Sequence, residues 1–382
     1  MNPERRAVPA VMAQFFMNGV VFATWGVQIP VLKARFEVGD SMMSLAMLCV
    51  AGGAIVAMRS VGRWTTRFGS ARTMTASALL SAASLSAIAW PGNFGGLLVT
   101  LLAFGMTMAA FDVSVNVQAN QLEQRGLRIM STLHGMFSLG GMAGAGIGGL
   151  LLGAGVSMPM HLALIAVTLV IATAVGIAWL LPDAPQAPPA AGEPLPSART
   201  TSHALRILGL VAFLGLVCEG AMYDWAAIYM RDVAGTSLDH SARGYAAFST
   251  GMAVARFGAD HLRRRASEQT LLTVGAWIGF AGITLVIAWP HAVLTLVGLF
   301  LMGLGVANLM PFFFLAGARI PGMSAAEGVA GVARFAYAGM LFVPPIIGAL
   351  AHGAGLRVAL GAVAITMGWI AWRGIRRIHR VA

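Results

Sequence analysis

The chain has 382 residues, of which 58% are hydrophobic and 10% are charged, and its mean hydropathy is +0.79. Soluble domains carry about 25% charged residues, so this composition excludes a soluble globular protein and indicates a multi-pass membrane protein. The net charge of +11 comes from short basic clusters between apolar runs, so we expect a lipid bilayer and no nucleic acid as its surroundings. Cys49 and Cys218 lie in separate apolar runs without a CxxC spacing, and we expect no metal and no cofactor.

The apolar runs predict twelve membrane-spanning helices, because about 20 apolar residues are enough to cross a bilayer. The first run follows "MNPERR" and is too long for the apolar part of a signal peptide, so we expect it to be retained as a helix. The predicted spans are 7–29, 42–62, 73–90, 95–118, 133–156, 160–181, 205–230, 242–258, 269–289, 292–316, 328–352 and 355–373.

The positions of the basic residues predict the orientation. Most of the 25 Lys and Arg residues fall on one side of these spans if both termini lie on that side. Basic residues concentrate in cytoplasmic loops. We therefore expect a multi-pass protein of the bacterial inner membrane with both termini in the cytoplasm.

The segment 182–204 interrupts this pattern, since it is rich in Pro, Ala and Ser and has no apolar period. It predicts a cytoplasmic linker between an N-terminal six-helix bundle (1–181) and a C-terminal six-helix bundle (205–382) with a short basic tail. "IAWP" occurs in both halves, and Gly105 and Gly303 match at nearly the same spacing. The fold class is therefore an all-α membrane protein with two pseudo-symmetric bundles, as in two-lobed transporters. We expect a monomer.

The loop after the second span carries a motif. In "GRWTTRFGSAR", Gly62, Arg67, Gly69 and Arg72 match the signature Gly-x-x-x-Asp-Arg-x-Gly-x-Arg/Lys-Arg/Lys, while Thr66 takes the acidic position. Together with the six-plus-six plan, this loop resembles the major facilitator superfamily. "FDVSVNVQAN", "STLHGMFSLGG", "EGAMYDWAAIYMRD" and "GLGVANLMPFFF" resemble the bacterial YbjJ-type proteins, distant relatives of fucose permeases. The resemblance implies alternating access around a cavity lined by the first, fourth, seventh and tenth spans.

A polar stripe interrupts the fourth span. Asp112 and Asn116 lie one helical turn apart in "AAFDVSVNVQANQ", with Asn120 a further turn along, and we expect Gln118 and Gln121 to widen the stripe. One interpretation is a cavity-facing stripe with Asp112 as proton acceptor; the other is a structural carboxylate paired with a buried arginine. The fucose-permease-like symporters carry a functional acid in this helix, so the resemblance favours the first.

Each of the other cavity-lining spans also offers a polar group near mid-membrane. Glu219 lies deep in the seventh span with Tyr223 one turn later, and Asn18 and Asn308 lie near the middle of the first and tenth spans. Intramembrane acids mark proton or substrate sites by default, yet Glu219 is equally compatible with a structural ion pair. The amides could line the cavity or form ordinary interhelical hydrogen bonds.

Two aromatic residues complete the predicted cavity. Trp25 and Tyr337, together with Tyr223, could supply faces for a sugar-like ring. Trp25 is equally compatible with an interfacial belt position.

Three further charged residues are candidates for a charge pair or gate. Arg334 is the one basic residue deep in a span, and we hypothesise that it pairs with Asp112 in one state and releases it in another. Arg256 and Asp260 stand four residues apart, a spacing that lets them pair on one helix face. The simpler interpretation of Arg256 is that it extends to the lipid headgroups.

A glycine stripe, Gly140, Gly144 and Gly148, predicts close helix packing in the fifth span. We find no hydrolase elbow, zinc motif or nucleotide-binding loop, so we expect no enzyme. The sequence favours a proton-coupled secondary transporter for a small polar organic solute. An exporter or drug:proton antiporter of the same superfamily is the alternative, and a non-transporting membrane receptor is the third possibility.

Overall fold

The computed structural model describes residues 3–127, 129–181, 203–263, 265–317, 319–320 and 325–375. The predicted linker therefore lies largely outside the described residues, and the proposed domain boundaries stay predictions. The described part folds into the helices α1 (Pro3–Arg35), α2 (Asp40–Phe68), α3 (Ser70–Ala87), α4 (Phe94–Gln124), α5 (Met130–Gly153), α6 (Met158–Gly176) with a 3-10 turn (Ile177–Trp179), α7 (His203–Asp232), α8 (Leu238–Arg263), α9 (Glu268–Ala288), α10 (Ala292–Val306), α11 (Leu309–Gly317), α12 (Ala325–Ala354) and α13 (Leu356–Trp369) with a π-turn (Ile370–Gly374).

Ten spans in the described residues are long and apolar enough to cross a membrane, with α10 and α11 together forming one of them. Helices α3 and α8 complete the predicted set but are more polar. In α3 the hydroxyls of Thr73 and Ser77 donate to the carbonyls of Gly69 and Thr73, at 2.8 and 2.7 Å. Because these hydroxyls are satisfied by their own helix, α3 can lie in the bilayer despite its composition.

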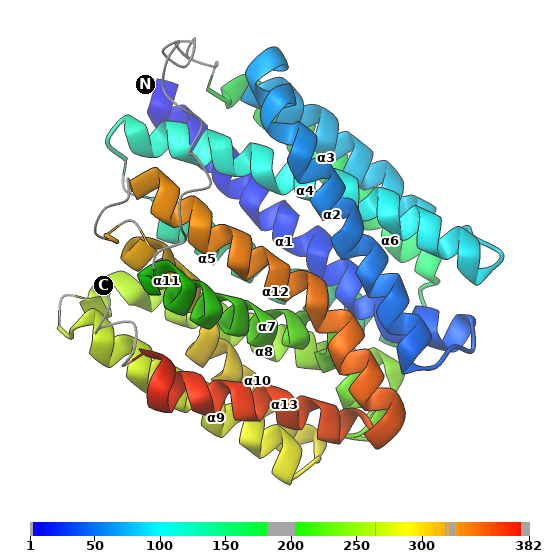
Figure 1. Cartoon of the computed structure of the whole chain (residues 1–382). Coiled ribbons are helices and arrows are strands. Elements are labelled where there is room, and N and C mark those ends of the chain that lie inside the picture. The colour runs from blue at the N-terminus through cyan, green and yellow to red at the C-terminus, as the bar shows by residue number, and fades with distance from the viewer. Residues whose placement is uncertain are drawn as a thin grey trace.

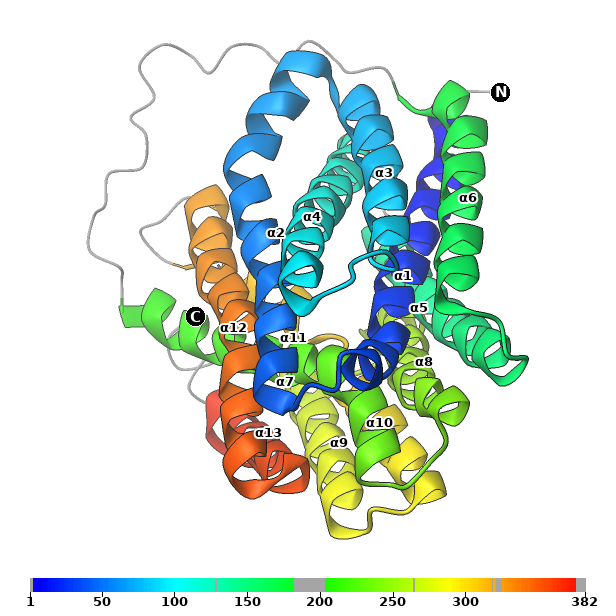
Figure 2. The ribbon, with the colours of Figure 1, turned by 90° about the vertical axis from the view of Figure 1, so that its right-hand side faces the viewer.

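The helices form two bundles, α1–α6 and α7–α13, which lie one above the other in Figure 2. Helix α1 begins and α13 ends on the same side of the molecule, which we call the terminal side; the opposite side, where α1 leads into α2, is the far side (Figure 1). Many helices exceed the predicted spans. Helix α1, for example, runs from Pro3 to Arg35, where residues 7–29 were predicted, because its charged ends extend past the apolar run.

Close glycine crossings repeat in the two bundles. A Cβ placed on Gly105 of α4 would collide with the carbonyl of Val50 in α2, and one on Gly303 of α10 would collide with the carbonyl of Phe248 in α8. The reciprocal crossings use Gly53 of α2 and Gly251 of α8. The sequence repeat thus corresponds to a repeated packing of α2 on α4 and of α8 on α10.

The two "IAWP" segments end α3 and α9, and an arginine caps each end. Arg35 donates to the carbonyls of Ala89 and Pro91, at 2.7 and 2.9 Å. Arg357 donates to the carbonyls of Ile287 and Ala288, at 2.7 and 3.1 Å. These guanidinium groups satisfy carbonyls that a helix end leaves without partners.

The bundles meet in two places: α5 packs along α8, and α2 contacts α12 on the far side of the molecule. Gly135 and Gly149 of α5 approach Phe257 and the Asp239 carbonyl near opposite ends of α8. Helices α2 and α12 meet on the far side and diverge toward the terminal side (Figure 1). The bundles are therefore close together on the far side, and on the terminal side they separate between these two helices.

The predicted glycine stripe lies inside the N-terminal bundle. Gly140 packs against the carbonyl of Phe16 and Gly144 against Val20, so these residues hold α5 close to α1. The face of α5 toward the other bundle carries different glycines, including Gly141, whose Cβ would lie 3.1 Å from Ser249 Oγ. Gly148 points to Val27 and His161. The stripe is a surface within one bundle, and the neighbouring face of α5 packs against α8 of the other bundle.

Candidate functional site

The carboxylate of Asp112 lies between α4 and α1, near the middle of both helices. Asn18 Nδ2 donates to Asp112 Oδ1 at 2.7 Å, and Asn116 Nδ2 lies 3.5 Å from the same oxygen while donating to the Asp112 carbonyl at 2.8 Å. Asn18 is fully buried, about 22 Å along α1 from Pro3 at 1.5 Å per residue. The side chains found around this carboxylate are thus neutral amides.

Gln118 and Gln121 do not widen the stripe, which corrects the expectation from the sequence. Gln118 Nε2 donates to Ser70 Oγ at 2.6 Å and to the Leu181 carbonyl at 3.0 Å, and its Oε1 accepts from the Leu181 amide at 3.1 Å. Gln121 also donates to Ser70 Oγ, at 3.2 Å. Six residues after Asp112, Gln118 lies about 120° around the helix from it, where it connects α4 to α3 and to the residues after α6.

Arg256 of α8 forms the second polar centre and connects the two bundles. Its Nη2 lies 3.5 Å from Glu219 Oε1 in α7, and its Nη1 donates to Ser138 Oγ in α5 at 2.7 Å. Its Nε donates to the Ala307 carbonyl at 3.4 Å. Both charged side chains are 11% exposed. One guanidinium group therefore contacts α5 of one bundle and α7 and the α10–α11 junction of the other.

This arrangement corrects the simpler interpretation of Arg256. The side chain turns inward to Glu219 and Ser138 and does not extend to the headgroups. The four-residue spacing to Asp260 pointed to a pair on the same helix, but the Asp260 side chain lies outside those the structure describes. Glu219 and Ser138 come from distant parts of the chain, so no local spacing could have identified them.

The tenth predicted span is broken, which also corrects the sequence analysis. Helix α10 ends at Val306 and α11 begins at Leu309, so Ala307 and Asn308 form a turn at the level of Arg256. Asn308 Nδ2 donates to the Ala255 carbonyl of α8 at 3.3 Å. Backbone outside helices is tolerated in a membrane where it faces protein or a polar cavity. Here the freed Ala307 carbonyl has the guanidinium group as its partner.

Of the three aromatic residues predicted to line the cavity, two are buried in the protein. Tyr223 is 6% exposed, packs on the rings of Phe22 and Phe248, and donates its hydroxyl to Met252 Sδ at 3.1 Å. Trp25 is 2% exposed and lies against Phe104 of α4, with ring centroids 6.3 Å apart. Neither ring presents a face to solvent in this conformation. The Tyr337 side chain is outside the described set.

Arg334 and the α2–α3 loop occupy the terminal half of the molecule. The Arg334 side chain is exposed and forms none of the ion pairs found among the described residues, so its pairing with Asp112 in another conformation stays a prediction. In the loop, Gly69 joins α2 to α3 with φ +91°, a backbone angle that favours glycine. Gly62, Arg67 and Arg72 lie on either side of this turn.

The far side carries an ion cluster that sequence reasoning did not identify. Lys33 Nζ lies 2.6 Å from Asp40 Oδ1 in α2 and 2.5 Å from Asp232 Oδ2 in α7. Arg231 contacts the same Asp232 at 2.6 Å and donates to the Pro30 carbonyl of α1 at 2.5 Å. These contacts join the bundles where α1 and α7 end. In the sequence, these residues are recognisable only as basic and acidic residues at the ends of apolar runs.

The fold and these interior polar centres define a multi-pass, all-helical membrane protein built from two bundles. A family model for the Major Facilitator Superfamily matches residues 11–343. The chain belongs to this superfamily and is a transporter of that family. Its relatives include membrane protein MosC of Rhizobium meliloti, 32% identical over 94% of this chain and 87% of the relative. An uncharacterized MFS-type transporter of Yersinia pestis is 30% identical over 92% of this chain and 91% of its own length.

Solved structures share the fold at low sequence identity. A mutant of the nucleoside transporter NupG aligns with a TM-score of 0.75 at 12% identity, covering 99% of this chain and 100% of that one. A D-xylose–proton symporter aligns with a TM-score of 0.73 at 13% identity, covering 97% of this chain and 98% of that one. These comparisons confirm the predicted fold class, and the finer resemblance to YbjJ-type proteins and fucose permeases stays a prediction.

Proposed function

We propose that the protein moves a small polar organic solute across the bacterial inner membrane by alternating access, coupled to protons, with its terminal side in the cytoplasm. The observation that carries the proposal is the Asp112 carboxylate, which lies in the membrane interior with Asn18 and Asn116 as its described polar contacts. A carboxylate with neutral neighbours can bind and release a proton without an ion pair having to break.

Glu219 and Arg256 supply the second part of the proposed mechanism. Protonation of Glu219 removes the charge that holds Nη2 of Arg256, 3.5 Å away. The guanidinium group then keeps Ser138 of the other bundle and the Ala307 carbonyl as partners. The pair with Glu219 lies within the C-terminal bundle, and the contact with Ser138 crosses to the other bundle, so a guanidinium group freed from Glu219 can shift while it stays attached to α5. Proton binding and bundle movement are thereby linked through one side chain.

The conformation fits an inward-facing state under the proposed orientation. The Lys33–Asp232 and Arg231–Pro30 contacts hold the far side together, while α2 and α12 diverge on the terminal side (Figure 1). Alternating access requires these far-side contacts to break when the outer path opens. The proposed site between α1 and α4 would then be reached from either side in turn.

The chemistry of the interior favours a polar solute. The amides of Asn18 and Asn308 and the Arg256–Glu219 pair lie in the interior of the protein. A hydrophobic multidrug cavity would need none of these polar groups. Two transporters with this fold are named for a nucleoside and for D-xylose with a proton, which agrees with this solute class. The alternative, a drug:proton antiporter or exporter, uses the same fold and differs in the direction of solute and proton flux.

Uptake into proteoliposomes tests the proposal, with the solute first selected by a ligand-stabilisation screen of the purified protein. We expect an imposed pH gradient to drive accumulation in the wild-type protein. In Asp112→Asn we expect accumulation to vanish while solute exchange survives. Glu123→Gln is the matched control, because Glu123 also lies on α4 but accepts the amides of Ile129 and Met130 at its end, both at 2.8 Å. Binding without flux, or unchanged gradient dependence in Asp112→Asn, would contradict the proposal.

A further inference from the structure

An apolar pocket of about 460 Å³ opens between α2, α3 and α4 in the terminal half of the N-terminal bundle. Helix α2 contributes Ala57, Trp64 and Phe68, α3 contributes Arg72 and Leu80, and α4 closes the back. Figure 2 views this side, with α4 seen between α2 and α3. Trp64, Phe68 and Leu80 are 41%, 50% and 58% exposed, so the pocket opens toward the surroundings of the bundle.

This pocket is separate from the interior site. Ala110 and Met106 of α4 line it, and Asp112 lies two residues after Ala110. At about 100° per residue, two positions differ by roughly 200°, so Ala110 and Asp112 lie on opposite faces of α4. Asp112 faces Asn18 of α1 inside the protein, and the pocket therefore faces the membrane.

The hydroxyl groups in the wall have partners within the protein. The hydroxyls of Thr73 and Ser77 donate to carbonyls of their own helix, Gly69 and Thr73, at 2.8 and 2.7 Å. The Thr107 hydroxyl is 2.8 Å from that of Ser84. With these groups satisfied, the wall presents hydrocarbon surface. A sugar or another polar solute would find no partner there, whereas an acyl chain needs none.

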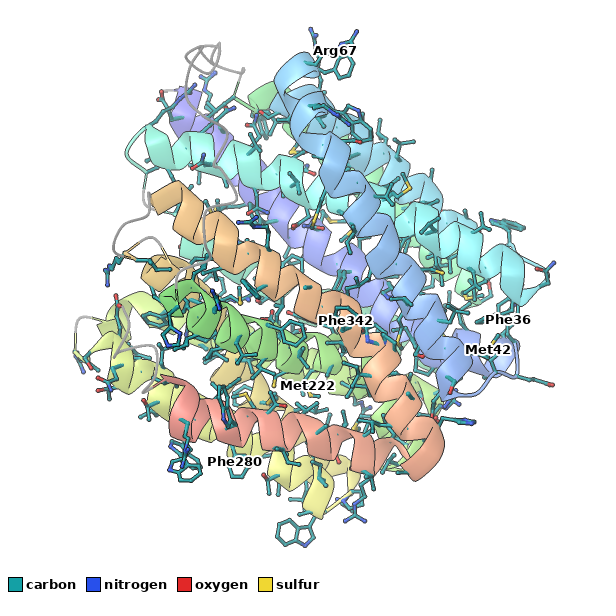
Figure 3. All side chains as sticks on the ribbon, in the orientation of Figure 1. Phe36, Met42, Arg67, Met222, Phe280 and Phe342 are labelled. Carbon is teal, nitrogen blue, oxygen red and sulfur yellow. The ribbon has the colours of Figure 1, made fainter. Side chains whose placement is uncertain are left out.

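The mouth of the pocket is positively charged. Arg72 lies in its wall and is exposed, and the guanidinium carbon of Arg67 lies 5.3 Å from the ring centre of Phe68, another wall residue. Arg67 projects from the end of α2 in Figure 3. Neither arginine takes part in an ion pair with another described residue. From Asp40 to Asp112 the sequence has no acidic residue in between.

From the pocket and its charged mouth we infer a binding site for an anionic phospholipid. One acyl chain occupies the space between α2, α3 and α4, and the headgroup phosphate lies against Arg67 and Arg72. Anionic headgroups attract arginines at the membrane surface, each contributing about five-fold in affinity. The site is independent of the transport cavity, because it lies on the other side of α4.

Quenching of Trp64 fluorescence tests this site in the full chain, reconstituted in phosphatidylcholine nanodiscs. The probes are phosphatidylglycerol and phosphatidylcholine with brominated acyl chains, and the Trp64 signal is the difference between the wild type and Trp64→Phe. We expect brominated phosphatidylglycerol to quench this signal at a several-fold lower mole fraction than brominated phosphatidylcholine. We expect Arg72→Gln to reduce that preference about five-fold.

Two control variants separate the headgroup from the chain. Arg319→Gln, which removes an exposed arginine from the other bundle, is expected to leave the preference unchanged. Ala76→Phe fills the pocket and is expected to abolish quenching by both lipids at an unchanged melting temperature. Equal quenching by the two lipids in the wild type would overturn the inference. A preference that disappears on adding inorganic phosphate would also overturn it, since the arginines would then bind free phosphate.

Discussion

Lys33 of α1 and Asp232 of α7 form a direct ion pair between the two bundles, 2.5 Å from Nζ to Oδ2. The same ammonium group lies 2.6 Å from Asp40, so it is held from both sides on the far side of the molecule. The side chains of Lys33 and Asp232 are 12% and 27% exposed, which leaves the pair open to screening by salt. This pair must break before the far side can open.

The first prediction concerns this contact. We expect Asp232→Asn to favour opening of the far side by about 1 kcal/mol, or about five-fold in the equilibrium, because partly exposed pairs are worth no more than that. Distances between spin labels at the far-side ends of α2 and α8 measure the change. Exchange of the two charges, Lys33→Asp with Asp232→Lys, places two acids beside each other near Asp40 and should not restore closure. High salt should reproduce part of the effect in the wild type and none in the variant.

The second prediction concerns Glu219 and Arg256. Removal of one partner from a buried ion pair leaves an uncompensated charge and costs about 3–5 kcal/mol. We expect Arg256→Gln to lower the melting temperature strongly, and Glu219→Gln with Arg256→Gln to recover much of the loss. Thermal unfolding in one detergent measures both. A double variant no more stable than Arg256→Gln would show that Ser138 and the Ala307 carbonyl, and not Glu219, hold the guanidinium group.

The third prediction tests the hypothesis that Asp112 and Arg334 pair in another conformation. Asp112→Arg and Arg334→Asp should each abolish transport, and the two together should restore part of it. Correct insertion, checked by folded yield and melting temperature, is the control. If both single variants and the double variant fold but remain inactive, the two residues do not depend on each other.

The fourth prediction concerns the repeated glycine crossings. A Cβ on Gly53 would collide with the Leu102 carbonyl, and one on Gly251 would collide with the Phe300 carbonyl. We expect Gly53→Ala and Gly251→Ala to destabilise the protein by similar amounts, about 1–3 kcal/mol each, as overpacked sites do. Gly52→Ala is the matched control, since its Cβ would have its nearest neighbour at 3.9 Å. Thermal unfolding compares the three; equal melting temperatures would contradict the packing.

Much of the architecture follows from the order of apolar residues alone. The apolar runs, the basic loops and the internal repeat predict the two-bundle fold, and the three-to-four-residue period places Asp112 and Asn116 on one face of α4. Such patterns work because membrane helices must be long and internally hydrogen-bonded. The first and last turns of the helices were not predicted, because charged residues can continue a helix beyond the hydrocarbon layer, as Lys33 and Arg35 do in α1.

The contacts between distant helices could not be predicted in the same way. Ser138 and Glu219 are separated from Arg256 by 118 and 37 residues, and each lies on a different helix. The break at Ala307 and Asn308, in contrast, has a local signal: Pro311 has no N–H to donate to the Ala307 carbonyl, and its ring displaces that carbonyl from the helix. Ser138 and Glu219 are brought to Arg256 by the packing of α8 against α5 and α7, which a single sequence does not reveal.

The break between α10 and α11 has a consequence for how such a protein can diversify. Arg256 is anchored there by the carbonyl of Ala307, a main-chain atom. A substitution at position 307 changes the side chain and leaves that oxygen in place. Side chains around the turn can therefore change during evolution, and the cavity can adapt to new solutes. The hydrogen-bond acceptor for the guanidinium group is kept, because it belongs to the main chain.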